Sequence, residues 1–142
     1  MKKEIKFLMI LFVLLCNLSC SKSDSNPVNP NIVYKANLVG NNSIQTTNST
    51  ATGTATLTYN TTTKLFTLAV TYTGLTVTSS HIHKIGAGVI VAISPNVSPI
   101  NFTSTTPLTT TEETELASSQ YYFNLHSSAF PGGEISGIFI RQ

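Results

Sequence analysis

Cysteine is nearly absent from this 142-residue chain, and its two copies, Cys16 and Cys20, both lie near the N-terminus. No disulfide and no cysteine-based zinc site can therefore hold the rest of the chain together. Tryptophan is missing and charged residues make up only 10% of the chain. From Cys20 onward five cations offset five carboxylates, so this part has no net charge. The balance excludes the basic surface of a nucleic-acid-binding protein. The length suits one small domain.

Long hydrophobic runs are also missing, apart from nine apolar residues at 7–15 that follow a cationic start. A membrane-spanning helix needs about 20 apolar residues, so this run is too short to cross a bilayer. A cationic start, a short apolar run and the small residue Ser19 are typical of a secretory signal peptide. The sequence therefore predicts a signal peptide over residues 1–19.

Cys20 follows this predicted cleavage site, an arrangement that resembles a bacterial lipoprotein signal. The resemblance implies that Cys20 carries acyl chains and anchors the protein in the cell envelope, in the outer membrane of a bacterium. Asn17 and Leu18 depart from the residues usual before such a cysteine. An ordinary signal peptide, with Cys20 as an unpaired thiol, is the alternative. The Ser, Asn and Pro residues that follow predict a disordered tether over 20–30.

The body, residues 31–142, contains 22 threonines and many Val, Ile, Tyr and Phe residues, which favour strands. Alternation of apolar and polar side chains predicts eight strands: Ile32–Val39, Thr54–Tyr59, Leu65–Tyr72, Thr76–His83, Gly88–Ile93, Ile100–Ser104, Gln120–Leu125 and Glu134–Arg141. We predict an all-β domain, an antiparallel Greek-key β-sandwich or barrel.

One segment departs from the strand pattern. Thr109 and Glu112 have the spacing of a capping box, which predicts one or two helical turns. Glu112, Glu113 and Glu115 are interpreted as a solvated acidic turn, because the spacing of an EF-hand calcium site is absent.

All three histidines lie in two short segments, His81 and His83 in one and His126 in the other. Residues i and i+2 of a strand point to the same face, so His81 and His83 face together. With His126 from a neighbouring strand they form a candidate site for zinc or copper, which imidazole nitrogens bind. The alternative is that each neutral imidazole hydrogen-bonds a backbone carbonyl and fixes a loop without metal.

These segments, in this order, resemble the CHRD domain first described in chordin. The residues that carry the resemblance are Gly74-Leu75, His81-Ile82-His83, Tyr121 to Ser127, and Phe130 to Gly137. The resemblance runs from about Tyr34 to Arg141. It departs from the family pattern at Lys84, where Gly is frequent, and at Ser136, where the usual Arg would pair with Glu134. It implies an extracytoplasmic all-β module with no established catalytic activity.

The stretch around His81 and His83 is also similar to the copper-ligand strand of copper/zinc superoxide dismutases, which share a Greek-key architecture. That enzyme site needs four copper-binding histidines and an aspartate at its zinc site. This chain has three histidines, and its one aspartate, Asp24, lies in the predicted tether. We therefore do not expect dismutase activity.

Two functions stay open from the sequence. The first is a non-enzymatic, lipid-anchored envelope module that binds a protein or glycan partner. Tyr121 and Tyr122 are its candidate binding surface, because adjacent strand residues cannot both face one core. The second is a metal-binding or redox module that uses the three histidines.

Overall fold

The computed structural model describes residues 28–94 and 97–142. The predicted signal peptide and Cys20 lie outside these residues, as does most of the predicted tether. The described part contains nine strands and one helix: β1 (Asn31–Val39), β2 (Thr52–Asn60), β3 (Phe66–Thr73), β4 (Ser79–Lys84), β5 (Val89–Ile93), β6 (Ile100–Thr103), α1 (Thr110–Ala117), β7 (Tyr121–His126), β8 (Ile135–Ile138) and β9 (Ile140–Arg141). None of the helical residues described forms a segment long and apolar enough to cross a membrane.

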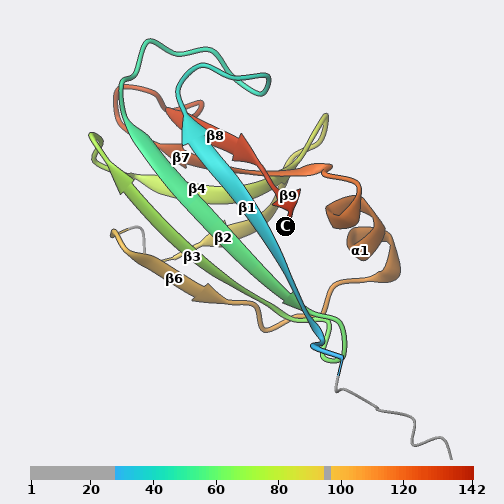
Figure 1. Ribbon diagram of the computed structural model, residues 1–142. Coiled ribbons are helices and arrows are strands. Elements are labelled where there is room, and N and C mark those ends of the chain that lie inside the picture. The colour runs from blue at the N-terminus through green and yellow to red at the C-terminus, as the bar shows by residue number, and fades with distance from the viewer. Residues whose placement is uncertain (1–27, 95–96) are drawn as a thin grey trace, which may run out of the picture.

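Strands β1, β2 and β3 form an antiparallel meander, which Figure 1 shows as three long arrows side by side. The alternation predicted for β2 is confirmed, since Ala55, Leu57 and Tyr59 are buried. Leu57 lies opposite Tyr34 of β1 and Leu68 of β3. Directly opposed residues point to the same face of a sheet, so these three strands contribute one continuous row of apolar side chains to the interior.

The order of the hydrogen-bonded strands is β5-β4-β7-β8-β1-β2-β3-β6, with β9 paired to β1. Strand β7 returns to pair with β4 after the chain has passed through β5 and β6, which is a Greek-key connection. The two end strands, β5 and β6, flank a hollow of about 490 Å³ whose lining includes Val91 and Phe102. The sheet is thus a nearly closed barrel, and the predicted all-β Greek-key class is confirmed.

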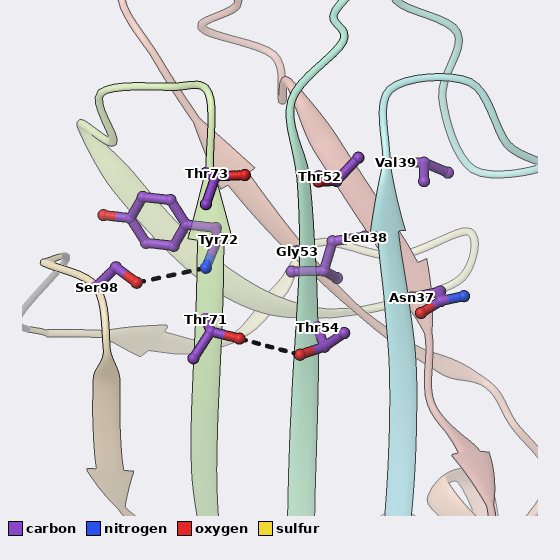
Figure 2. A pocket seen from close by; sticks show the side chains of 10 residues that line it. All are labelled: Asn37, Leu38, Val39, Thr52, Gly53, Thr54, Thr71, Tyr72, Thr73 and Ser98. Carbon is purple, nitrogen blue, oxygen red and sulfur yellow. Dashed lines mark hydrogen bonds between the residues drawn. The ribbon is translucent and has the colours of Figure 1, made fainter.

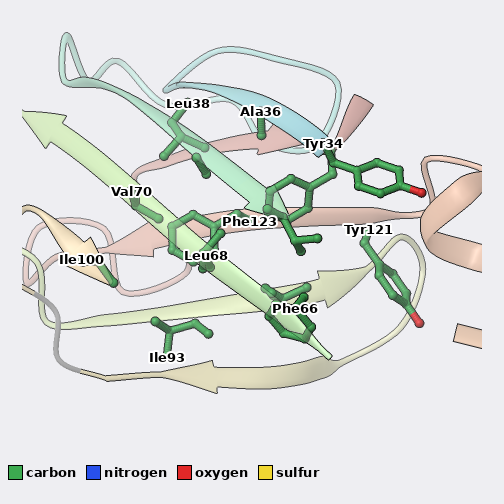
Figure 3. Close-up of a cluster of buried hydrophobic side chains, with 14 of the residues drawn as sticks. Tyr34, Ala36, Leu38, Phe66, Leu68, Val70, Ile93, Ile100, Tyr121 and Phe123 are labelled. Atoms are coloured by element: carbon green, nitrogen blue, oxygen red, sulfur yellow. The ribbon is translucent and has the colours of Figure 1, made fainter. Parts of the chain in front are cut away.

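The core fills the inside of this barrel. Figure 3 shows side chains from β1, β3 and β7 meeting there, among them Leu38, Leu68 and Phe123. Phe123, Leu125 and Ile135 are fully buried. Burying a side chain of this kind contributes about 1.5–3 kcal/mol relative to leaving it exposed. Apolar burial therefore supplies the main stabilisation, as the near absence of cysteine requires.

The last predicted strand, Glu134–Arg141, is continuous in the prediction but interrupted in the structure. Phe139 leaves the ladder, donates its N–H to the Tyr121 carbonyl at 3.0 Å and buries its ring in the core. Gly137 lies so close to β1 that a Cβ atom would stand 2.1 Å from the Asn37 carbonyl oxygen. The chain therefore separates into β8 and β9.

Helix α1 begins as predicted. The Thr109 side chain accepts the Glu112 N–H, and the Glu112 carboxylate accepts the Thr109 N–H at 2.7 Å. This reciprocal pair satisfies two donors that a helix start otherwise leaves without a partner. The predicted capping box is confirmed.

The interpretation of the acidic turn as merely solvated is wrong for Glu113. Its carboxylate accepts hydrogen bonds from Lys64 Nζ, at 2.8 Å, and from the Tyr59 hydroxyl. These two hydrogen bonds, with that of Lys64 the stronger influence, lower the pKa of Glu113. Glu113 thus attaches the helix to the β2–β3 end of the barrel.

Glu115 makes the matching attachment on the other side. It accepts from Lys84 Nζ at 2.5 Å and from the Tyr121 hydroxyl at 2.8 Å. Tyr121 is only 3% exposed, so the prediction that it belongs to an exposed aromatic surface is wrong. The Tyr121 hydroxyl therefore donates its hydrogen bond to Glu115 of the helix and is not available to a binding partner.

Candidate metal centre

The outer face of β4 and β7 carries the three histidines. The strands pair antiparallel, and three opposed pairs build this face: Ser79 with His126, His81 with Asn124, and His83 with Tyr122. Ile82, between the two β4 histidines, points inward and is 2% exposed. The predicted orientation of β4 is therefore confirmed, and β7 brings His126 to the diagonal position beside His81.

His126 is held at both ring nitrogens. Its Nδ1 lies 2.8 Å from the Pro131 carbonyl oxygen, and its Nε2 lies 3.0 Å from Nδ1 of His81. A carbonyl accepts only, so Nδ1 of His126 carries the proton and Nε2 carries a lone pair. That lone pair faces His81 and accepts its Nδ1–H.

His83 is different, because its Nε2 is buried and has no partner with hydrogen-bond geometry. Its ring stacks on Tyr122, with centroids 5.0 Å apart and planes at 9°, and meets His81 edge-on at 5.5 Å. The Gly88 backbone and the Asn124 side chain are the hydrogen-bonding neighbours of the ring, and Nε2 makes no hydrogen bond of good geometry. A buried polar atom in this state is rare in native proteins and indicates a missing ligand, ion or water.

Two rings of the cluster, those of His81 and His83, are shifted toward the neutral form. Burial lowers the pKa of His81, and the neighbouring His126 and His83 lower it further. Burial and then His126 also lower the pKa of His83, which polar groups of Asn124 and Gly88 offset in part. Neutral imidazole is the form that binds metal ions.

The ring nitrogens, one from each histidine, all lie within 4.8 Å of one another. Four ligands at 2.0–2.1 Å around a tetrahedral ion place their donor atoms about 3.3 Å apart. The widest gap must therefore close by about 1.5 Å, which is within the reach of side-chain rotations of the half-buried His81 and His83. The structure thus brings together the three residues that the sequence singled out.

Two loops enclose the cluster. The loop after β7 supplies the Pro131 carbonyl and turns at Gly133, where φ is +122° and a Cβ would lie 2.7 Å from Gln45 Oε1. Gln45 belongs to the loop between β1 and β2. That loop is tied down by Glu134, whose carboxylate accepts from Ser49 Oγ at 2.6 Å.

Glu134 does not complete a catalytic triad. Its backbone N–H donates to the carbonyl of Leu125, next to His126, but its carboxylate accepts from Ser49, and the His126 nitrogens bond Pro131 and His81. Among the residues that the structure describes, no carboxylate is hydrogen-bonded to a histidine. Ser136, which stands where the family usually has Arg, hydrogen-bonds Asn42.

A second hollow lies on the threonine-rich outer face of β1, β2 and β3 (Figure 2), with a volume of about 550 Å³. Figure 2 shows Thr54 and Thr71 bonded to each other across neighbouring strands, at 3.1 Å, and Tyr72 beside Ser98. No acidic, basic or histidine side chain lines it. It therefore offers no group for acid–base chemistry or metal binding.

Sequence reasoning missed the place of Tyr122 and of Asn124 in the histidine site. Tyr122 is half-buried and stacks on His83, so it forms a wall of the site, while its role as a binding surface stays a prediction. Asn124 is 3% exposed and lies between the histidines. Its position two residues before His126 on a strand is a signal that would have placed it on their face.

The fold and the site define the class of protein, a small Greek-key β module with a histidine cluster on the outside of its barrel. The model of the CHRD domain family matches residues 34–139, well over half of the chain, and the chain therefore belongs to the CHRD domain family. The comparisons with curated proteins and with solved structures each find no match. Membership of the family makes an extracellular or structural module the expected setting.

Proposed function

We propose that this protein is a lipid-anchored, extracytoplasmic CHRD module of the cell envelope that binds a transition metal ion, zinc or copper, through His81, His83 and His126. One observation carries the metal proposal. Nε2 of His83 is buried without a hydrogen bond of good geometry, in a cluster whose three histidines bring ring nitrogens within 4.8 Å of one another. A cation in that cluster would satisfy His83 and use the lone pair of His126.

The rival explanation, purely structural hydrogen bonding, accounts for both ring nitrogens of His126 but leaves Nε2 of His83 without a hydrogen bond of good geometry. His126 fixes its loop through the Pro131 carbonyl, as that explanation requires. Metal-binding histidines also donate their second ring nitrogen to a backbone carbonyl, which orients the ligand. The same contact therefore serves a metal site, whereas a buried nitrogen without a partner costs stability.

We propose a non-enzymatic role in the envelope. The described residues offer no histidine–carboxylate pair for proton transfer. A protein or glycan partner would have to use a surface other than Tyr121, which is buried. The proposed envelope location depends on the signal and on Cys20.

The metal proposal is tested by metal analysis and calorimetry on protein purified without chelator. We expect one zinc or copper ion per chain, and loss of that ion in His83→Ala. Ser79→Ala is the matched control, because it alters the same face of β4 and adds or removes no nitrogen ligand. Metal-free wild-type protein that also fails to bind added zinc or copper would refute the proposal.

The anchor is tested separately by mass spectrometry of the membrane fraction. We expect an acylated N-terminal Cys20 in the wild type and a soluble, unmodified protein in Cys20→Ser. Cys16→Ser is the matched control, because the other cysteine lies inside the predicted signal. An unmodified mature N-terminus in the wild type would contradict the proposed lipid anchor and would leave the metal proposal unaffected.

A further inference from the structure

This inference rests on the proposed metal site and concerns Asn124, whose side chain is 3% exposed. Asn124 lies directly opposite His81 and two residues before His126, on the face that carries all three histidines. Its diagonal neighbour on β4 is His83. The asparagine is therefore surrounded by the three imidazoles and is covered from solvent.

The amide of Asn124 is left unsatisfied at its oxygen end. Its Oδ1 is buried and has no hydrogen-bond partner. Its Nδ2 faces the turn after β7, 3.1 Å from where a Cβ on Gly133 would lie. The oxygen is therefore the end of the amide that is available on the side of the histidines.

A second observation places the same oxygen beside His83. The sheet register makes His83 the diagonal neighbour of Asn124 on the same face, and the Asn124 side chain lies close enough to act on the ring as a hydrogen-bonding group. Oδ1 of Asn124 and Nε2 of His83 are therefore neighbours, and neither makes a hydrogen bond of good geometry.

We propose that Oδ1 of Asn124 is the fourth ligand of the metal ion, which completes a closed site of three nitrogens and one oxygen. A metal cation can accept a lone pair from each of these two atoms at once. The amide oxygen is a harder donor than a thiolate or thioether, and with three imidazoles it suits Zn²⁺ rather than Cu⁺.

A closed coordination sphere makes the proposed site structural rather than catalytic. Zinc sites that take four ligands from the protein are structural, whereas catalytic zinc sites keep one position for water or substrate. With Asn124 bound, the ion links β4 to β7 and to the loop after β7, through the Pro131 carbonyl that orients His126. The site holds zinc and stabilises this side of the barrel.

Co²⁺ as a spectroscopic substitute for zinc, with azide as an added ligand, tests the fourth position. In the wild type we expect a strong visible spectrum of tetrahedral Co²⁺ that azide leaves unchanged. In Asn124→Ala we expect a spectrum that shifts when azide is added, and Zn²⁺ affinity about 10–100-fold weaker. Gln45→Ala is the control, because Gln45 is the other amide beside Gly133 with a buried atom lacking a partner. It should behave as the wild type.

Asn124→Asp is a second variant that tests the proposal if Asn124→Ala fails to fold. It keeps the shape of the side chain and supplies an anionic oxygen. We expect it to bind Zn²⁺ at least as tightly as the wild type and to resist azide. A wild-type spectrum that responds to azide, or equal Zn²⁺ affinity in Asn124→Ala, would overturn the fourth ligand while leaving the three-histidine site intact. A wild type that takes up neither Co²⁺ nor Zn²⁺ would overturn both.

Discussion

Nδ1 of His81 and Nε2 of His126 lie 3.0 Å apart although the two residues are 45 positions apart in the chain. This hydrogen bond joins β4 to the end of β7, and a metal ion would have to replace it. The exchange needs no change of net charge, because His81 can move its proton to the other ring nitrogen and remain neutral. The metal-free cluster is therefore already assembled, and binding requires only small side-chain movements.

Zinc should stabilise the folded protein. A ligand that binds only the native state at 100 times its Kd adds about 2.7 kcal/mol. For a domain of this size each kcal/mol raises the Tm by about 4–8 °C. We expect this rise in a calorimetric scan of the wild type and its loss in His83→Ala and His126→Ala. An equal rise in these variants would place the bound zinc elsewhere.

Gly133→Ala should destabilise the loop that covers the site. The residue has φ of +122°, which a side chain disfavours, and the new Cβ would lie 2.7 Å from Gln45 Oε1. Backbone strain of this kind costs about 1–3 kcal/mol. Urea unfolding measures the loss, and zinc titration should show weaker binding as the Pro131 carbonyl shifts.

The neighbouring Gly132 supplies the matched control for that prediction. A Cβ there meets nothing within 4 Å, so Gly132→Ala should leave both stability and zinc affinity close to the wild type. If Gly132→Ala and Gly133→Ala lose equal stability, the close contact with Gln45 is not the cause.

The strands could be predicted because burial follows a period of two. Ala55, Leu57 and Tyr59 alternate with threonines, and this pattern alone fixes which face of β2 enters the core. The same rule placed His81 and His83 together. Capping was predictable too, because the Thr109 and Glu112 interaction is local in sequence.

The failures involve tertiary contacts that strand alternation does not predict. Alternation says that only one of Tyr121 and Tyr122 faces inward, but not which one. The hydroxyl of Tyr121 donates to the carboxylate of Glu115, which belongs to a helix whose position no local pattern gives. The break at Phe139 likewise depends on the Tyr121 carbonyl.

Acid should release helix α1 from the barrel. Hydrogen bonds from Lys64 and Tyr59 lower the pKa of Glu113 below its ordinary value of 4.5, and those from Lys84 and Tyr121 do the same for Glu115. A carboxylate with a lowered folded pKa contributes stability above its unfolded pKa, and the contribution is lost as the pH falls through the folded value. We expect stability measured by urea unfolding to fall below about pH 4.5.

The double variant Glu113→Gln with Glu115→Gln is the control for this pH effect. Its stability should be lower at neutral pH and should change less below pH 4.5. The histidines act in a separate range, because lowered pKa values of His81 and His83 remove stability as the pH falls below their ordinary 6.5. An unchanged acid slope in the double variant would show that the two carboxylates do not fix the helix.

Thr109→Ala should cost about 1 kcal/mol, because it removes the side-chain acceptor of the Glu112 N–H at the start of α1. Thr111→Ala is the matched control within the same helix, since Thr111 is exposed and alanine has the higher helix propensity. Urea unfolding should therefore show a loss for the first variant and no loss for the second. Because Glu113 and Glu115 tie this helix to Lys64 and Lys84, a loss of the cap should also weaken the acid dependence of stability. Equal stability of the two variants would mean that these ion pairs, rather than the capping box, hold the helix start in place.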